Sequence, residues 1–403
     1  MLGNAILNSA LVSAAVLLAA AAAPADTGGD TVSEMRAMWV ARWDITSPEA
    51  CRTLVKLARD YNLNTLVVQV RGRGDALYKS RLEPPCETLD PPDFDPLGMI
   101  LDEGHKAGLQ VHAWINANYT WGAAQMPVSP EHIVNKHPDW LMRTSQNAVT
   151  FTAGGETEGA YTCPTNQLFR EFLRDIYLDV ATNYDVDGVH FDFIRYPSTD
   201  YCYCDRCLSA FQTEIDSRLD PQEKLTVANL PDRNAYTSAF PGAWDSFRRE
   251  QITKEVYTVY DAVKAVQPNV MVSASVFANS SDAYNHRFQD WKRWLADRKL
   301  DALFPMAYST STDTFADQIQ DAVSSSRGIP VCAGIGSYQI TAESTIEKIQ
   351  KARELGAAGW CLFSYSVTDQ GKKTEYVRTV RDKAAPERVL LPLPSKGEKW
   401  PSR

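Results

Sequence analysis

Eight short extended apolar runs, which alternate with amphipathic helical segments, constrain the fold of this chain most strongly. The runs are RAMWVA from Arg36, NTLVVQV from Asn64, LQVHAWI from Leu109, DGVHFDF from Asp187, VMVSASV from Val270, DALFPMAY from Asp301, IPVCAGI from Ile329 and GWCLFS from Gly359. Strands that alternate with helices are typical of parallel sheets, and eight such units predict an α/β fold of the (β/α)8 TIM barrel type. We assign this barrel to residues 34–372 and a C-terminal tail to residues 373–403.

Helix signals support this alternation. Pro48 opens a segment whose Leu54, Leu57 and Ala58 fall on one stripe, and Gly108 ends another segment as a C-terminal capping glycine. A further helix is expected over the segment NHRFQDWKRWLADRK, which starts at Asn285. No internal repeat is apparent beyond the alternation of strands and helices.

Two connections are too long for ordinary linkage. Residues 116–165 follow the third strand and residues 194–242 follow the fourth. Loops beyond roughly 12–15 residues are usually functional or disordered. Both loops follow the carboxyl ends of strands, which is the face where TIM barrels build their active sites. We therefore expect the site at this face of the barrel.

The first 30 residues read as a signal peptide and linker. An apolar run from Ala10 to Ala23 is followed by small residues, Pro, Gly and Asp, although the leader carries no Lys or Arg. This pattern predicts a secreted or periplasmic protein, membrane-anchored if the leader is not cleaved. The net charge of -9 argues against a nucleic-acid or anionic-membrane partner. The oligomeric state is not predicted.

The stretch DGVHFDFIRYP contains the principal candidate for catalysis. By the two-residue period of a strand, Gly188, His190 and Asp192 should point into the barrel, whereas Val189, Phe191 and Phe193 should face the helices. Asp192 then lies at the carboxyl end of the strand, in a catalytic position. Arg195 and Tyr196 follow at the rim as candidate substrate-binding residues. The alternative is that Asp192 pairs with Arg195 or His190 and stabilises the barrel mouth.

Glycosidic bond cleavage commonly needs a second carboxyl group. The sixth and seventh strands end without Asp or Glu, which leaves Asp44, Asp75 and Asp282 as candidates. We prefer Asp75 as the second catalytic residue, because neighbouring glycines let the backbone approach a ligand closely. An equally good interpretation is that Asp75 caps the turn that follows it.

Other side chains on the inner face could bind substrate. His112, Trp114 and Asn116 share one face of the third strand, where the indole could stack on a sugar ring. A packed layer of side chains inside the barrel would explain the same pattern. The remaining candidate substrate-binding residues are Gln69, Arg71, His190 and Tyr308.

A cysteine motif lies in the loop after the fourth strand. Cys202, Cys204 and Cys207 have the spacing C-x-C-x2-C, and together with Cys163 or a histidine they could bind zinc. Disulfide bonds are the alternative, and export would favour them. A site with four protein ligands has no open position, so we expect a structural role and no cofactor for catalysis.

Four long motifs resemble those of the bacterial glycosyl-hydrolase-like family ten. They are RAMWVARWD, NLNTLVVQVRGRGDALYKSRLEPP, VHAWINANY and DGVHFDFIRYP, and the resemblance extends from Glu34 to about Ser366. It implies a (β/α)8 glycosidase, and some members of the family are thought to act on peptidoglycan glycan strands. The family motif also includes Asp75. In this chain Phe193 stands where many members carry a second acidic residue.

These patterns lead to one functional hypothesis and one alternative. The hypothesis is a secreted glycoside hydrolase that cleaves a polysaccharide or peptidoglycan-type glycan by carboxylate catalysis. The alternative, motivated by the missing acids on the sixth and seventh strands, is a non-catalytic glycan-binding TIM barrel. A metal-dependent deacetylase fits less well, because the sequence has no cluster of histidine ligands.

Overall fold

The computed structural model of this chain describes residues 33–154, 157–366, 373–389 and 391. The signal peptide predicted at residues 1–30 and most of the predicted tail after residue 389 lie outside the described residues. Within the described residues, no helix combines the length and the apolar character needed to cross a membrane.

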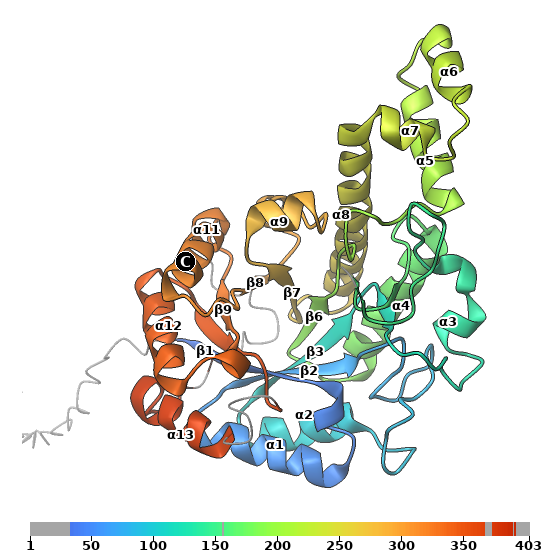
Figure 1. Ribbon diagram of the computed structural model, residues 1–403. Coiled ribbons are helices and arrows are strands. Elements are labelled where there is room, and N and C mark those ends of the chain that lie inside the picture. Colours follow the sequence, from blue (N-terminus) through green and yellow to red (C-terminus); the bar gives the residue numbers. More distant parts are fainter. Residues whose placement is uncertain (1–32, 155–156, 367–372, 390, 392–403) are drawn as a thin grey trace, which may run out of the picture. The chain divides into compact units, whose positions relative to one another are not determined.

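Eight parallel strands close into a barrel, which confirms the predicted fold (Figure 1). All eight predicted runs form these strands, and their order around the barrel is β1-β10-β9-β8-β7-β6-β3-β2. The strands are β1 (Met35–Val40), β2 (Thr65–Arg71), β3 (Gln110–Asn116), β6 (Gly188–Asp192), β7 (Met271–Phe277), β8 (Ala302–Met306), β9 (Cys332–Ile335) and β10 (Gly359–Leu362). Their carboxyl ends therefore meet on one face of the barrel.

Helices surround the barrel. They are α1 (Pro48–Asp60), α2 (Pro96–Lys106), α4 (Gln167–Asn183), α8 (Pro241–Val266), α10 (Trp291–Ala296), α11 (Thr312–Ser325), α12 (Ala342–Glu354) and α13 (Lys373–Ala384). Helix α13 falls within the predicted tail, but it packs against α12 and completes the alternation after β10. The helix expected from Asn285 begins only at Trp291, because the intervening Phe288 is buried with a left-handed φ of 57°.

The two long loops carry structure of their own. After β3 the chain forms a small antiparallel sheet, β4 (Tyr119–Trp121) with β5 (Ala160–Tyr161), and a short helix α3 (Ile133–Lys136) between them. After β6 it forms α5 (Asp205–Asp216), α6 (Pro221–Ala228) and α7 (Ala235–Ala239), which Figure 1 shows grouped beside the first part of α8. Further short elements are α9 (Ser280–Asn285) and the 3-10 helices η1 (Arg42–Asp44), η2 (Pro138–Trp140) and η3 (Ser337–Gln339).

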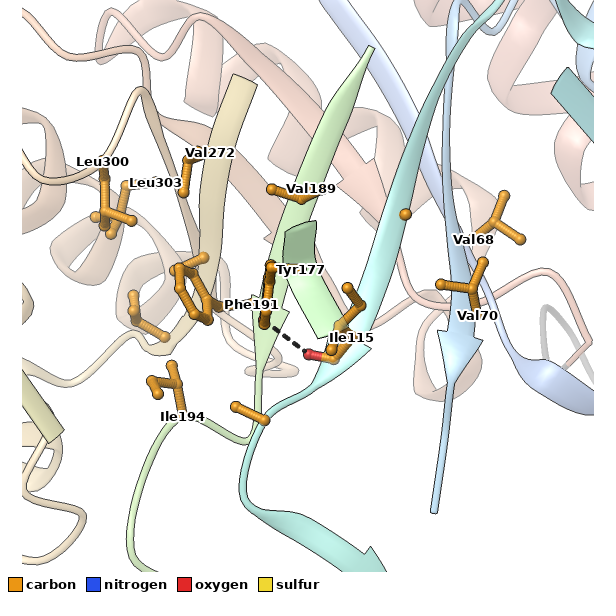
Figure 2. Packing of buried hydrophobic residues seen from close by; sticks show 14 of the residues in the cluster. Val68, Val70, Ile115, Tyr177, Val189, Phe191, Ile194, Val272, Leu300 and Leu303 are labelled. Atoms are coloured by element: carbon orange, nitrogen blue, oxygen red, sulfur yellow. Dashed lines mark hydrogen bonds between the residues drawn. The ribbon is translucent and has the colours of Figure 1, made fainter. Parts of the chain in front are cut away.

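An outer core lies between the strands and the helices. Val189 and Phe191 of β6 point into it, as their parity predicted, and the Phe191 ring lies 4.6 Å from the ring of Tyr177 in α4. The Tyr177 hydroxyl donates a hydrogen bond to the carbonyl oxygen of Ile115 over 3.4 Å (Figure 2). This contact joins α4 to the strand next to β6 and fixes the helix against the barrel wall.

The barrel interior holds a second, separate core with polar members. Trp39, Trp114 and Phe304 are among its buried apolar residues. The fully buried His190 hydrogen-bonds to Ser273 Oγ through Nδ1 and to Ser275 Oγ through Nε2, each over 2.8 Å. Burial holds the pKa of His190 well below its usual value, so this ring is neutral and structural.

Gly188 lets the inner layers of the barrel pack closely. A Cβ atom at this position would lie 2.8 Å from the ring of His112, which is itself fully buried on the neighbouring strand. The ring cannot move aside, because the surrounding strands enclose it.

We expect Gly188→Ala to lower the free energy of unfolding by about 1–3 kcal/mol, because it overpacks the interior. Denaturant unfolding measures the change. Gly242→Ala is the matched control, because a Cβ there would meet no atom within 4 Å. Equal stability of the two variants would contradict the proposed packing.

Candidate active site

A cavity of about 390 Å³ opens at the carboxyl ends of the strands. Side chains from β1, β2, β3, β6, β7 and β8 reach it, and so do residues of both long loops. Its lining residues are Trp39, Ala41, Arg42, Trp43, Gln69, Gly72, Trp114, Asn116, Tyr119, Glu158, Asp192, Phe193, Arg195, Ser275, Phe277, Met306, Tyr308 and Phe363. The location agrees with the face expected for TIM-barrel sites.

Asp192 is the last residue of β6 and lines this cavity. It lies in register with Asn116 of β3, and its Oδ1 accepts a hydrogen bond from the backbone N–H of Phe193 over 2.7 Å. Only 8% of the residue is exposed. Burial raises the pKa of Asp192 to about 7, although the Phe193 N–H and the charge of Arg195 act in the opposite direction. The carboxyl group can therefore carry a proton near neutral pH.

The side chain of Phe193 does not point in the direction that the two-residue strand period predicted. It was expected to face the helices, but it lines the cavity, because β6 ends at Asp192 and Phe193 has a left-handed φ of 50°. Its ring stacks on Tyr119 with 5.0 Å between the centroids. A phenylalanine in this conformation is uncommon and is held by its surroundings. The strand period thus stops predicting side-chain direction one residue after Asp192.

Glu158 is a second carboxylate in the cavity, and the sequence did not reveal it. It precedes β5 in the long loop after β3 and forms an ion pair with Arg195, with 2.8 Å between Oε1 and Nη2. The Tyr161 hydroxyl donates a hydrogen bond to its Oε2 over 2.6 Å. Burial acts to raise the pKa of Glu158, but the charge of Arg195 and these hydrogen bonds outweigh it and lower that pKa below its usual value.

The two carboxyl groups therefore differ in protonation. Between the pKa of Glu158 and that of Asp192, the first is ionised and the second is protonated. Two carboxyl groups whose environments separate their pKa values are typical of an acid and its catalytic partner. The negative charge of Glu158 also contributes to the raised pKa of Asp192.

Arg195, which was predicted at the rim, interacts with both carboxyl groups. It forms the ion pair with Glu158, and its charge acts on Asp192. Its guanidinium is almost fully buried and lies over the ring of Phe193 at 4.8 Å and that of Phe277 at 5.2 Å. Stacking and the ion pair restrict its rotamers. It therefore presents a fixed positive charge beside Glu158.

Aromatic rings form much of the cavity wall. Tyr308 stacks on Phe363 with 5.3 Å between centroids, and Trp114 contacts Phe363 edge to face at 6.5 Å. Trp43 is 55% exposed, and its Nε1 donates to Ser366 Oγ over 2.9 Å. Flat apolar faces beside polar groups suit the two kinds of surface that a sugar ring presents.

Several predicted substrate-binding residues do line the cavity, namely Gln69, Trp114, Asn116, Arg195 and Tyr308. Asn116 is held on both sides, because its Oδ1 accepts from Trp114 Nε1 and its Nδ2 donates to the carbonyl oxygen of Gly72, each over 2.8 Å. Gln69 Oε1 accepts from the backbone N–H of Arg42 over 3.1 Å. These amides thus position the indole and the loop after β1.

Other predicted substrate-binding residues are buried outside the lining. Arg71 is fully buried in a bidentate pair with Glu83, at 2.7 and 2.8 Å, and also donates to the carbonyl oxygen of Asn116. His112 hydrogen-bonds to Gln110, and burial lowers the pKa of His112 to about 4. His190 belongs to the serine network of the interior. The packed-layer alternative therefore describes the surroundings of His112.

Asp75 and Tyr196 also lie away from the cavity lining. Asp75 is 3% exposed, and its Oδ1 accepts from the backbone N–H of Arg73 over 3.0 Å. This hydrogen bond stabilises the turn before Asp75, whereas the alternative interpretation expected a cap on the turn after it. Tyr196, predicted at the rim, is fully buried and packs edge to face on Phe288 at 5.3 Å. Neither residue lines the cavity that Asp192 reaches.

Some lining residues could have been found from the sequence. Arg42 and Trp43 follow β1 after a single residue, so the rule that strand ends supply sites points to them. Glu158 lies far along an irregular loop, where no periodicity marks its direction. The pairing of β4 with β5 places the neighbouring Tyr161 beside Tyr119 of the lining, and the ion pair with Arg195 holds Glu158 at the cavity.

Four cysteines form a buried cluster. The sulfur atoms of Cys163, Cys202, Cys204 and Cys207 all lie within 4.8 Å of one another. No disulfide bond is present in the described part of the chain, which includes all eight cysteines. The histidine considered as a fourth ligand is not needed, because Cys163 occupies that place. We call this group the four-cysteine cluster.

Comparisons with known proteins agree with this architecture. The family described as Glycosyl hydrolase-like 10 matches residues 34–351. The glycosyl hydrolase YngK of Bacillus subtilis (strain 168) is 24% identical over 350 residues, which cover 76% of this chain and 61% of that protein. The glycosyl hydrolase DigH of Escherichia coli (strain K12) is 27% identical over 320 residues, which cover 71% of this chain and 64% of that protein.

Among solved structures, the glycoside hydrolase domain of PgaB (BpsB) from Bordetella bronchiseptica has a similar fold. The TM-score is 0.63 at 13% sequence identity, and the match covers 86% of this chain and 99% of that domain. The present chain spans less than two thirds of the length of the two curated relatives.

The raised pKa of Asp192 makes stability depend on pH. The folded protein keeps the proton up to about pH 7, whereas an unfolded chain releases it at about pH 4. Stability contributed by this proton is present below the unfolded pKa and is lost as pH rises through the folded pKa. Asp192→Asn should therefore gain about 2–4 kcal/mol in unfolding free energy relative to the wild type between about pH 4 and pH 8.

Denaturant unfolding at a series of pH values measures this difference. Asp102→Asn is the control, because Asp102 is exposed on α2 and pairs with Lys106 in solvent. A difference between Asp192→Asn and wild type that stays constant with pH would contradict the raised pKa.

Proposed function

Because this chain belongs to the Glycosyl hydrolase-like 10 family, we propose that it hydrolyses glycosidic bonds of a glycan, with Asp192 as the general acid. The observation that carries the proposal is one cavity with two carboxyl groups in opposite protonation states, Asp192 and Glu158. Glycoside hydrolysis requires a proton donor for the leaving oxygen and a second, ionised carboxylate.

In this mechanism the protonated Asp192 donates its proton to the glycosidic oxygen as the bond to the anomeric carbon breaks. The ionised Glu158 stabilises the positive charge that develops on the sugar ring, and acts as nucleophile or as base toward water. Arg195 and Tyr161 keep Glu158 ionised and oriented. When Glu158 reacts, the hydrogen bonds that Arg195 and Tyr161 donate to it must weaken.

The proposed substrate is a polysaccharide or a peptidoglycan-type glycan. The aromatic walls, including the exposed Trp43, suit stacking on successive sugar rings. Arg42 adds positive charge to the lining, which suits glycans that carry carboxylate groups, whereas Glu158 offsets the charge of Arg195. The signal peptide predicted at residues 1–30 would deliver the enzyme to glycans outside the cytoplasm.

A glycan-binding barrel without turnover is the second candidate. One argument for it is the ion pair between Glu158 and Arg195, which engages the second carboxylate of the cavity. The other is that strands β8 and β9 end without an acidic residue. Incubation with a glycan panel that includes denuded cell-wall strands separates the two functions. Products from the wild type support hydrolysis, whereas binding without products from either wild type or Asp192→Asn supports the binding module.

Activity should have a bell-shaped dependence on pH. The basic limb should fall at about pH 7, where Asp192 loses the proton that it must donate. The acidic limb should fall below the usual glutamate range, because Glu158 must stay ionised and its pKa is lowered. Initial rates of glycan hydrolysis across pH measure both limbs. Full activity well above about pH 8 would exclude Asp192 as the acid.

Asp192→Asn and Glu158→Gln should each lower kcat by roughly 10²–10⁴-fold, because each variant removes one proton-transfer or charge-stabilising group. Asp192→Asn should also abolish the basic limb of the remaining activity. Asp102→Asn, on the exposed face of α2, should keep wild-type kcat. Wild-type turnover by Glu158→Gln would show that another group acts as the second carboxylate.

A further inference from the structure

The four-cysteine cluster joins two segments that are far apart in the sequence. Cys163 lies just after β5, in the loop that follows β3, whereas the other three cysteines lie in the loop that follows β6. All four side chains are buried. The four cysteines supply no reacting group to the proposed hydrolysis, so their chemistry needs a separate explanation.

The sulfur separations fit metal coordination better than disulfide bonds. The Cys163 sulfur lies 3.3 Å from that of Cys207 and 3.7 Å from that of Cys204. A disulfide bond requires about 2.05 Å. Tetrahedral zinc with Zn–S bonds of about 2.3 Å places its ligand sulfurs roughly 3.8 Å apart. The cluster thus has the number of ligands, the ligand type and the approximate spacing of a zinc site built from four thiolates.

The surroundings favour thiolates held by a cation. Cys163 is fixed by its backbone N–H, which donates to the carbonyl oxygen of Trp140 over 2.7 Å. The Tyr196 hydroxyl is fully buried beside the cluster and has no hydrogen-bond partner among the described residues. A buried hydroxyl donor without a partner is costly, and a metal-bound thiolate would offer it an acceptor.

We propose that the four-cysteine cluster binds one Zn²⁺ ion as a structural site that clamps the two long loops together at the active face. Four sulfur ligands fill the coordination sphere, so the ion has no open position for substrate or water. Soft thiolate ligands in tetrahedral geometry select zinc over the harder cations Mg²⁺ and Ca²⁺.

The clamp would act directly on the proposed active site. Cys163 lies two residues after Tyr161, whose hydroxyl orients Glu158. Arg195, the ion-pair partner of Glu158, begins the loop that carries the other three ligands. Joining these loops through zinc would therefore keep Glu158 and Arg195 in register across the cavity.

Metal analysis of the full chain, purified without chelators, tests the site independently of any glycan. We expect one zinc ion per chain in the wild type and a loss of bound zinc in Cys163→Ser. Cys51→Ser is the matched control, because Cys51 is equally buried but lies in α1, where its Sγ contacts the carbonyl oxygen of Ile45. This variant should keep the full zinc content.

Three results would overturn the proposal. They are a folded, metal-free wild type that does not take up added ZnCl2, a stoichiometric content of iron in place of zinc, or a disulfide among the four cysteines detected by mass spectrometry without reduction. If Cys163→Ser does not fold, the wild type still provides the test, because a thiol-reactive reagent should release zinc stoichiometrically as the four thiols react.

Hydrogen exchange tests the clamp itself. Removing zinc from the wild type should increase exchange in residues 157–166 and 198–207 and leave β1 unchanged. Re-addition of ZnCl2 should restore protection. Unchanged exchange in both loops after zinc removal would show that the ion does not hold them together. Failure of glycan hydrolysis has no influence on either result, so the two proposals can fail separately.

Discussion

Closure of the eight-stranded barrel is the constraint on which the remaining structure depends. A closed barrel seals every second side chain away from water, so each polar group inside needs a partner. His190 meets this requirement by hydrogen bonds to Ser273 and Ser275, and Gly188 makes space for the His112 ring. The same seal ends at Asp192, where the last inward side chain reaches the cavity yet remains largely desolvated. Burial by the closed barrel is thus the largest cause of its raised pKa, and the charge of Glu158 adds to it.

The second carboxylate owes its state to the opposite cause. Glu158 lies on a loop and takes its lowered pKa from the charge of Arg195 and the hydroxyl of Tyr161, which outweigh partial burial. Strand geometry therefore produces the proton donor, and loop contacts produce the ionised group. Because desolvation and ion pairing shift carboxyl pKa values in opposite directions, one cavity can hold both states at once.

The sequence predicted those features of the fold that follow from the alternation of residues along a strand and of strands with helices. All eight strands, the inward direction of Asp192 and the location of the site at the strand ends follow from alternation and chain order. Predictions failed where the strand ends. A left-handed backbone turns Phe193 into the cavity, and Tyr196 is buried against Phe288 instead of lying at the rim. Glu158 could not be predicted, since its position depends on tertiary pairing of a long loop. The catalytic roles of Asp192 and Asp75 stay predictions, and the cavity favours Glu158 over Asp75 as the partner.

The loop after β3 carries Glu158 and must be held in place, but the two-stranded sheet of β4 and β5 contributes little stability by itself. Strand β5 has two residues, and a two-stranded sheet is marginally stable by itself. Hydrogen bonds from Met142 N–H to the Tyr161 carbonyl oxygen and from Thr162 N–H to the Asn118 carbonyl oxygen, at 2.7 and 2.8 Å, add to it within one loop. These two hydrogen bonds do not reach the loop after β6, which carries Arg195 near its start. Direct hydrogen bonds join that loop to the loop after β3, from the Tyr203 N–H to the Arg143 carbonyl oxygen over 2.8 Å and between the Thr150 and Tyr201 hydroxyls over 2.9 Å. The four-cysteine cluster lies at the same junction, so a bound zinc ion would add to these contacts between the two loops.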